Sequence, residues 1–257
     1  MAAPDDHALA ADLAQRAGRL LLVLRAGGGN PDALRKAGDR QSHEFLMAEL
    51  ARERPADAVL SEEGLDDKAR LTADRVWIVD PLDGTREFGE PGRTDWAVHV
   101  ALWSRDASAS TGDLIAGAVA LPAQGLVLKT TPATDSADQV AQRPLRMVVS
   151  RSRASQLVKD VAALIGADLV PCGSVGAKVA TVITGENDVY LHSGGFYEWD
   201  TAAPVAVARP NGFHVSRIDG SQVAYNQEDP WLPDILVCRP AIADLLLNAV
   251  REVTHAI

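Results

Sequence analysis

The chain is organised around one stretch, Val76-Trp77-Ile78-Val79-Asp80-Pro81-Leu82-Asp83-Gly84-Thr85-Arg86-Glu87-Phe88. It opens with a β-branched and aromatic run, the composition of a strand that is buried on both faces. The run stops at two aspartates three residues apart, and Gly84 and Thr85 follow, where a helix can begin. A rigid strand end, a pair of hard oxygen ligands and free backbone N–H groups therefore coincide. Such a combination can hold metal ions and a phosphate side by side.

Apolar periodicity predicts the elements around this stretch. In the first half it indicates helices over residues 6–26 and from about Asp39 to just before Pro55, and strands over residues 58–60, 95–103, 114–121 and 125–129. After a linker-like segment at 130–143, short strands alternate with helices, which is typical of an α/β arrangement. The strands are predicted over 145–149, 168–171 and 187–191, and the helices over 154–165, 175–184, 200–209 and 241–255. We therefore place a boundary near residue 140, which divides the chain into 1–140 and 141–257.

The composition excludes several classes of protein. Of the 257 residues, 47% are hydrophobic and 23% are charged, as in ordinary globular proteins. The formal charge of −10 argues against binding a nucleic-acid polymer, whereas bound cations would still allow a small phosphorylated molecule to be held. Cys172 and Cys238 form no CxxC motif, and the N-terminus lacks the basic and apolar segments of a signal peptide. We therefore expect a cytoplasmic protein with reduced thiols and no membrane partner.

The two aspartates of the opening stretch suit magnesium, which prefers hard oxygen ligands. If Pro81 and Leu82 form a tight turn, both carboxylates and the Leu82 carbonyl would face one point. A pair of metal ions would need a further carboxylate. Glu62 and Glu63, at the end of a short strand, and Asp200, at the start of a helix, are candidates. The residue types alone leave three alternatives open, namely a turn at the Asp-Pro-Leu-Asp-Gly string, a solvated glutamate pair and a helix cap at Asp200.

Gly84 and Thr85 would provide the anion-binding half of such a site. The amides of a first helical turn point outward unpaired, and glycine lets a ligand approach the backbone closely. The Thr85 hydroxyl could hold a water molecule, and a Thr85–Asp39 pair could orient and deprotonate it. On spacing alone, however, Asp39 is the N-cap of the second helix.

Three segments in series resemble the inositol monophosphatase superfamily of lithium-sensitive, magnesium-dependent phosphatases. They are Ser61-Glu62-Glu63, Trp77-Ile78-Val79-Asp80-Pro81-Leu82-Asp83-Gly84-Thr85 and Glu198-Trp199-Asp200-Thr201-Ala202-Ala203. Their order and separation match the family over nearly the whole chain. The resemblance implies a layered α-β-α-β-α sandwich, an α/β (α+β) fold, and a phosphatase that uses two or three Mg²⁺ ions.

The resemblance also implies roles for individual residues. The metal ligands of this chain would be the side chains of Glu62, Asp80, Asp83 and Asp200 and the carbonyl of Leu82. Gly84 and Thr85 would hold the phosphate, and Thr85 with Asp39 would activate the nucleophilic water. Asp39 follows Gly38 at the place where the family carries its activating aspartate, which favours this role over an N-cap. Residues 1–140 would thus carry most metal ligands, and residues 141–257 would carry Asp200 and the substrate contacts.

Within the superfamily the chain resembles the 3'(2'),5'-bisphosphate nucleotidases of the CysQ group, and its actinobacterial branch in particular. The matching segments are Thr85-Arg86-Glu87-Phe88, Ser150-Arg151-Ser152-Arg153 and Gly173-Ser174 with Lys178. The resemblance implies hydrolysis of the 3'-phosphate of adenosine 3',5'-bisphosphate, with the 5'-phosphosulfate analogue as a further substrate, in sulfur assimilation. The implied substrate-binding residues are Gly84, Thr85, Ser150, Arg151, Ser174 and Lys178.

The chain departs from the nucleotidases at three positions. Arg153 stands where histidine is usual, Lys178 lies one residue further from Ser174 than in most relatives, and His192 replaces a substrate-contacting arginine. These departures favour an inositol-1-phosphate or fructose-1,6-bisphosphate phosphatase as an alternative. A non-catalytic metal- or nucleotide-binding protein is a second alternative, against which the intact set of ligands counts. No two of the six histidines stand at metal-ligand spacing, and all except His192 are expected to be ordinary core or surface residues. Monomer and homodimer both remain open.

Overall fold

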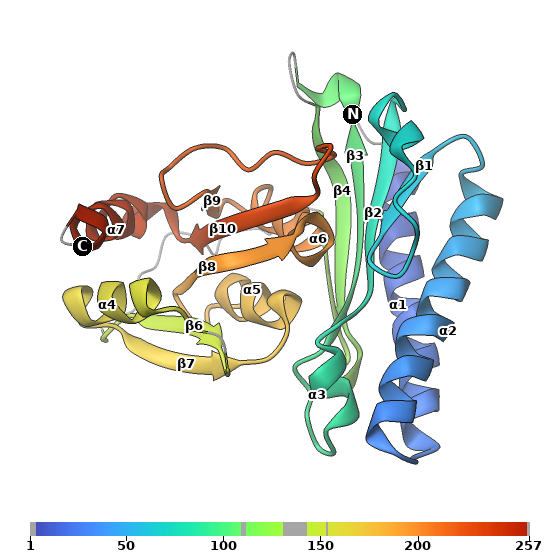
Figure 1. Cartoon of the computed structure of the whole chain (residues 1–257), viewed down its shortest axis with the longest axis horizontal. Helices are drawn as coiled ribbons and strands as arrows, with labels where there is room; N and C mark the ends of the chain where they lie inside the picture. Colours follow the sequence, from blue (N-terminus) through green and yellow to red (C-terminus); the bar gives the residue numbers. More distant parts are fainter. Residues whose placement is uncertain (1–3, 109–111, 131–142, 153, 256–257) are drawn as a thin grey trace.

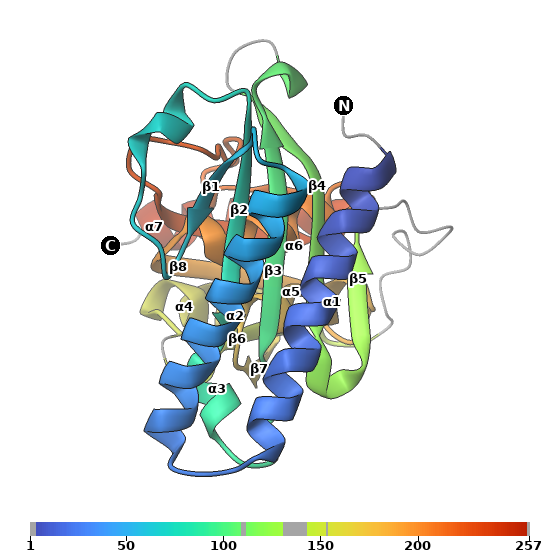
Figure 2. The ribbon, with the colours of Figure 1, turned by 90° about the vertical axis from the view of Figure 1, so that its right-hand side faces the viewer.

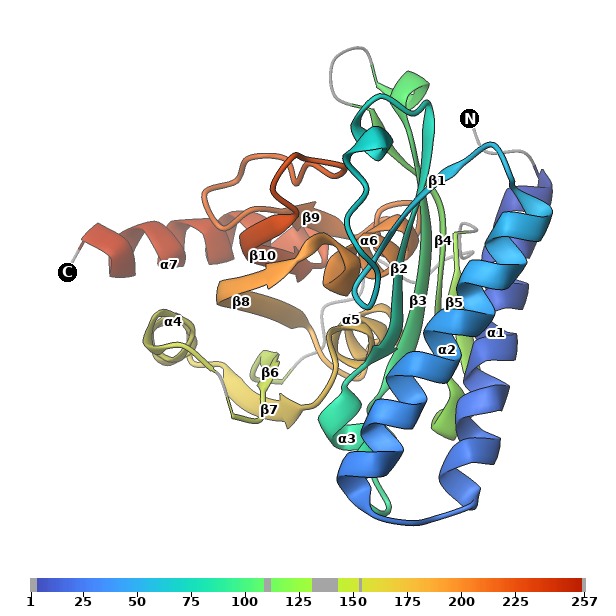
Figure 3. The ribbon, with the colours of Figure 1, turned by 45° about the vertical axis from the view of Figure 1, so that its right-hand side comes forward.

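Two five-stranded sheets and three layers of helices make up the chain in this computed structural model (Figure 1). The structure describes residues 4–108, 112–130, 143–152 and 154–255. Helices α1 (Pro4–Ala26) and α2 (Pro31–Glu53) cover the outer face of the first sheet (Figure 2). Between the sheets lie α5 (Val175–Ile183) and α6 (Glu198–Ala208), and beyond the second sheet lie α4 (Gln156–Ile165) and α7 (Ala243–His255) (Figure 3). The predicted α-β-α-β-α sandwich is confirmed.

The first sheet has the order β1-β2-β3-β4-β5. Its strands are β1 (Ala58–Ser61), β2 (Arg75–Asp83), β3 (Ala97–Ser104), β4 (Asp113–Leu121) and β5 (Leu126–Lys129). β1 pairs with β2 in parallel, and every other pairing is antiparallel. β2 is buried from Val76 to Asp83, as its run of apolar residues predicted, because helices cover both faces of the sheet. Strand β2 ends at the short helix α3 (Thr85–Gly89).

The second sheet has the order β7-β6-β8-β10-β9. Its strands are β6 (Arg146–Ser150), β7 (Asp168–Cys172), β8 (Val189–Tyr197), β9 (His214–Ser216) and β10 (Trp231–Cys238). The β6 pairings are parallel and the β10 pairings are antiparallel. The β8 strand extends six residues past the predicted end at 191, and β9 and β10 were not predicted. Cys172 and Cys238 are both free thiols.

The hydrophobic residues form three cores. One lies between the two sheets, and one lies on the outer face of each sheet. The middle core lies between the sheets and joins Ile78 of β2 to Val205 of α6 and Tyr190 of β8. The outer cores pack α1 and α2 on the first sheet and α4 and α7 on the second. The functional site is therefore built on elements that are fixed by packing on both sides. None of the described helices has both the length and the apolarity that a bilayer crossing requires.

The predicted start of the second helix at Asp39 is wrong. Helix α2 begins at Pro31, where the Asn30 side chain accepts hydrogen bonds from the amides of Asp32 and Ala33. Asparagine is a strong N-cap and proline suits the first helical position, so this start has a clear local signal. Asp39 therefore lies inside the helix and is free of any capping role. The predicted boundary at residue 140 lies outside the described residues, and the division into 1–140 and 141–257 stays a prediction.

Candidate active site

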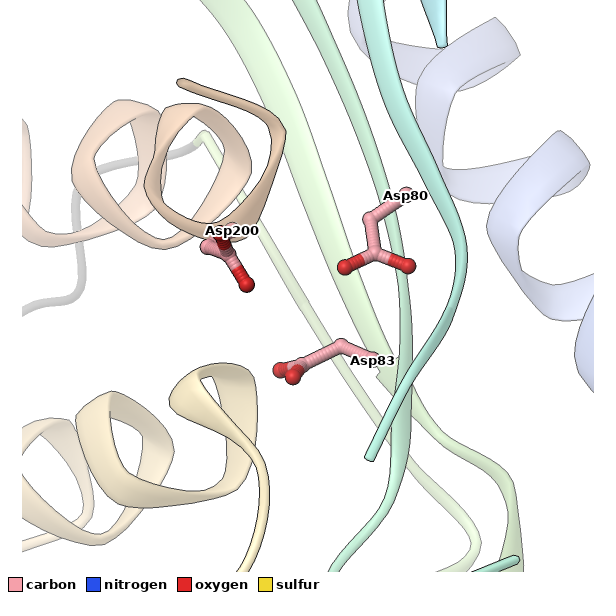
Figure 4. A group of neighbouring side chains, drawn as sticks. All are labelled: Asp80, Asp83 and Asp200. Atoms are coloured by element: carbon pink, nitrogen blue, oxygen red, sulfur yellow. The ribbon is translucent and has the colours of Figure 1, made fainter. Parts of the chain in front are cut away.

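Three aspartates from distant parts of the chain meet between the first sheet and the helices beside it. Asp80 and Asp83 come from the end of β2, and Asp200 comes from the first turn of α6 (Figure 4). One carboxylate oxygen of each lies within 4.8 Å of those of the other two. Asp80 and Asp83 are buried. The structure thus brings together three of the four side chains expected to bind metal.

A β-bulge explains how Asp80 and Asp83 reach the same side of the sheet. Residues three apart on a regular strand point to opposite faces. Here Asp80 pairs with His99 and Asp83 pairs with Ala97, so three steps along β2 match two along β3. The extra residue re-aims the strand, as bulges next to active sites commonly do. The Asp80 carboxylate accepts a hydrogen bond from the amide of Leu82 at 3.0 Å, which holds the turn.

Asp83 is stabilised as a carboxylate by its surroundings. Its Oδ2 accepts a hydrogen bond from the amide of Gly176, in the first turn of α5, at 2.6 Å and lies 3.1 Å from Nε2 of His99. Burial by itself would raise the pKa of Asp83, but His99, Lys178 and the Gly176 amide outweigh it and leave the pKa lowered. Asp83 is therefore ionised and ready to bind a cation.

Asp200 combines a capping role with a place in the cluster. Its carboxylate accepts a hydrogen bond from the amide of Tyr197 at 2.7 Å. The expected helix start and N-cap at Asp200 are wrong, because α6 begins at Glu198 with Tyr197 as its N-cap and Asp200 is its third residue. The capping contact does not exclude metal binding, because a carboxylate has several acceptor sites. The capping contact fixes the side chain, and its carboxylate points toward Asp80 and Asp83 (Figure 4).

Glu62 lies beside this cluster, just after β1. It lines the same cleft as Asp200, and part of its side chain is exposed there. Desolvation of the carboxyl group, followed by the charges of Asp200 and other carboxylates, raises the pKa of Glu62 to about 7. A hydrogen bond with Asp80 acts in the opposite direction and lowers the pKa of Glu62.

The charges of this cluster fit a divalent cation. Burial, and then the neighbouring carboxylates, raise the pKa of Asp80 well above its usual value. The raised pKa values of Asp80 and Glu62 express the cost of gathering carboxylates without enough positive charge. Because hard oxygens at short separation are the donors that magnesium prefers, a bound ion would remove that cost.

Asp39 and Thr85 form the predicted pair. The Thr85 hydroxyl lies 3.0 Å from Oδ1 of Asp39 and 3.1 Å from the carbonyl oxygen of Leu82. Burial raises the pKa of Asp39 to about 6, against the lowering effect of the Thr85 hydrogen bond. Gly38 allows this approach, since a Cβ there would lie 2.8 Å from Phe88 and 2.9 Å from Leu82.

The predicted substrate-binding residues have different surroundings. Ser150 and Lys178 line the cleft, and Lys178 is buried with its ammonium group donating to the carbonyl of Gly173. Ser174 is buried and caps α5 by accepting the amide hydrogen of Ala177. Arg151 pairs with Glu87 at 2.7 Å and with Glu90 at 3.0 Å.

Gly84 and the start of α3 lie close to the second half of the chain. Gly84 has a φ of +86°, and a Cβ there would lie 3.0 Å from Ser174. Glycine therefore satisfies both the left-handed backbone and the tight packing. Helix α3 has only five residues, so its first-turn amides, and not a long helix dipole, are what it offers an anion. Arg153 lies outside the described residues.

Aromatic rings line much of this cleft, and apart from His192 they were not among the predicted site residues. The cavity measures about 380 Å³, within the range of small-molecule sites. The Tyr197 and Trp199 rings stack at 4.7 Å, and the His192 and Phe196 rings stack at 4.8 Å. Trp231 also lines the cleft and is 48% exposed. The clustering of aromatic residues at 196–199 was the available sequence signal, but Trp231 comes from the unpredicted strand β10.

Comparisons with known proteins point to one family over nearly the whole chain. Residues 8–255 match the model of the inositol monophosphatase family. The chain is 50% identical over 240 residues to a Mycobacterium bovis protein named 3'-phosphoadenosine 5'-phosphate phosphatase. The match covers 92% of this chain and 90% of that protein. The structure of CysQ from Bacteroides thetaiotaomicron matches at a TM-score of 0.75 and 27% identity, over 91% of this chain and 97% of that chain. Inositol monophosphatase II from Staphylococcus aureus matches in fold, at a TM-score of 0.78 and 20% identity, over 95% and 94%.

Proposed function

The chain belongs to the inositol monophosphatase family, and from this we propose that it is a magnesium-dependent phosphatase that converts adenosine 3',5'-bisphosphate to AMP and phosphate. The 50% identity to a relative named for this activity carries the choice of substrate. The cluster of Asp80, Asp83 and Asp200, with a carboxylate oxygen of each within 4.8 Å of the others, supports the metal-dependent chemistry.

We assign the roles within the site as follows. The metal ligands are the side chains of Glu62, Asp80, Asp83 and Asp200 and the carbonyl of Leu82, which would hold two or three Mg²⁺ ions. Bound magnesium supplies charge neutralisation and a water molecule of lowered pKa. The substrate contacts are Gly84, Thr85, Ser150, Arg151, Ser174 and Lys178. Cytoplasmic location, sensitivity to lithium and a place in sulfur assimilation belong to the same proposal.

The Asp39–Thr85 pair is assigned to activating the nucleophilic water. The Thr85 hydroxyl donates its hydrogen to Asp39 across 3.0 Å, which leaves the lone pairs of its oxygen to accept a hydrogen bond. A water molecule that donates to this oxygen can lose a proton through Thr85 to the carboxylate. A protein that only binds metal or nucleotide has no need for this pair.

The substrate assignment is tested by kinetics with magnesium. We expect kcat/KM for adenosine 3',5'-bisphosphate to exceed that for inositol 1-phosphate and fructose 1,6-bisphosphate by at least about 100-fold, because binding groups matched to a substrate commonly discriminate by this much or more. A phosphate-release assay with the three substrates measures it. Equal values, or a preference for inositol 1-phosphate, would replace the nucleotide assignment by the alternative; no release from any of them would favour a binding protein.

Trp231 is expected to contribute to nucleotide preference. Stacking of a base on an aromatic side chain is worth about 1–3 kcal/mol, so Trp231→Ala should raise KM for adenosine 3',5'-bisphosphate roughly 5- to 150-fold. Trp231→Phe keeps an aromatic face and should retain most of the affinity. Activity on inositol 1-phosphate, which has no base, should change less than about threefold in both variants. A uniform loss on both substrates would show that Trp231 acts on the fold and not on the base.

A further inference from the structure

We propose that His99 is a positioning residue that holds Asp83 and Asp200 in one metal-binding arrangement. This inference rests on the metal site of the proposed function. His99 lies in β3 and is fully buried, with none of its surface exposed. The family motifs and the predicted ligand set do not include it.

The imidazole ring of His99 contacts Asp83 itself and the residue that precedes Asp200. Its Nδ1 donates to the carbonyl oxygen of Trp199 at 3.2 Å, and its Nε2 lies 3.1 Å from Oδ2 of Asp83. The Trp199 carbonyl belongs to the peptide group that joins Trp199 to Asp200. A single ring therefore connects the end of β2 to the first turn of α6.

Helix α5 packs closely against the His99 ring. A Cβ on Gly176 of α5 would lie 2.2 Å from Nε2 of His99 and 3.0 Å from Ala97, so glycine is what lets α5 approach. The amide of Gly176 donates to the same Asp83 oxygen that faces His99. With Oδ2 engaged in this way, Oδ1 is the oxygen that remains for a cation. The ring and the amide thus fix which oxygen Asp83 offers.

The arrangement matters because the two aspartates have no local connection. Asp83 is anchored to the first sheet and Asp200 to a helix between the sheets. Residues that orient metal ligands through hydrogen bonds typically change metal affinity about 10- to 100-fold when removed. His99 fills this role here through a hydrogen bond to the backbone carbonyl of Trp199 and a 3.1 Å approach of Nε2 to the Asp83 carboxylate.

Three substitutions separate the two contacts of His99. In His99→Gln the amide nitrogen can replace Nε2 toward Asp83, and in His99→Asn it can replace Nδ1 toward Trp199. His99→Leu keeps an apolar side chain of similar volume and loses both contacts. His214→Gln is the matched control, because His214 is a half-buried histidine of β9 that contacts Ser216.

The measurement is the Kd of Mn²⁺ alone, by titration calorimetry on the full chain freed of metal by a chelator. We expect His99→Leu to raise this Kd about 10- to 100-fold and the Gln and Asn variants to raise it less, about 3- to 10-fold. His214→Gln should leave it unchanged. Melting in the chelator identifies which variants are folded, and activity against metal concentration should shift in the same order.

Two outcomes would overturn the proposal. One is a folded His99→Leu protein that binds Mn²⁺ within twofold of the wild type. The other, decisive if His99→Leu does not fold, is wild-type binding by both His99→Gln and His99→Asn. Because Mn²⁺ binding needs no substrate, inactivity of the wild type on adenosine 3',5'-bisphosphate would refute the proposed substrate and leave this result to be judged separately.

Discussion

Replacing Asp80 by Asn is expected to lower kcat/KM on adenosine 3',5'-bisphosphate by at least about 10³-fold, because a lost metal ligand removes several kcal/mol of charge stabilisation in the transition state. Asparagine has the same shape, and its carbonyl can still accept the Leu82 amide hydrogen that Asp80 accepts at 3.0 Å. The loss should therefore come from the metal site and not from the fold. Kinetics at saturating magnesium measure it.

The same variant should be more stable than the wild type when metal is removed. Asp80 is buried beside other carboxylates, and its pKa is raised well above the usual value by burial and by those charges. The folded wild type must therefore either hold a repelled charge or bind a proton, and asparagine avoids both costs. We expect a melting temperature a few degrees higher in a chelator, since 1 kcal/mol corresponds to about 2–4 °C at this size.

Magnesium should reverse this order of stability. A ligand that binds only the folded state stabilises it by mass action, so the wild type should gain much more from magnesium than Asp80→Asn. Asp74→Asn is the matched control, because Asp74 lies just before β2 with a side chain that is 85% exposed. Near-normal activity of Asp80→Asn, or equal magnesium stabilisation in the two proteins, would contradict the assignment of Asp80 as a ligand.

Asp39→Asn is expected to lower kcat by about 10²- to 10⁴-fold, the usual contribution of a general base. The asparagine side chain can still contact Thr85 but cannot accept a proton from the water. KM should change little, because Asp39 lies on α2 and does not line the substrate cleft. Glu44→Gln is the control, since Glu44 is an exposed carboxylate on the same helix.

The pH dependence of Asp39 gives a second measurement. Burial raises the pKa of Asp39 to about 6, and only the carboxylate form can act as a base. Wild-type kcat should therefore fall as the pH drops through about 6, or through a lower value when bound cations favour the carboxylate. In Asp39→Asn the limb due to this group should disappear. A wild-type limb that persists unchanged in the variant would assign the base to another residue.

The sequence was most informative where a pattern is local. The apolar run from Val76 to Val79 predicted a strand buried on both faces, and the structure confirms it. The start of α2 was misplaced even though Asn30 and Pro31 form a clear local signal. Because the helix was expected to start at Asp39, the spacing alone assigned Asp39 as its N-cap. Only the resemblance to a family favoured its pairing with Thr85, which the structure shows at 3.0 Å.

The aromatic end of the cleft could not be predicted in the same way. Tyr197 and Trp199 are neighbours in the sequence, but Trp231 reaches the cleft through the pairing of β10 with β8. His99 was expected to be an ordinary histidine, since no second histidine stands at metal-ligand spacing. Its contacts are with Asp83 and Trp199, and the Trp199 contact spans 100 residues of sequence.

The residue pattern alone indicates the chemical types of the site: acidic residues at the ends of strand and helix segments, with a glycine and a threonine after Asp83. It could not determine that Asp80 and Asp83 face the same side, because three residues along a regular strand lead to opposite faces. The bulge in the β2–β3 pairing decided that, and packing of α6 against the first sheet brought Asp200 to meet them. Periodicity depends only on residues that are close in the sequence. Strand register and contacts between distant side chains depend on how whole helices and strands pack.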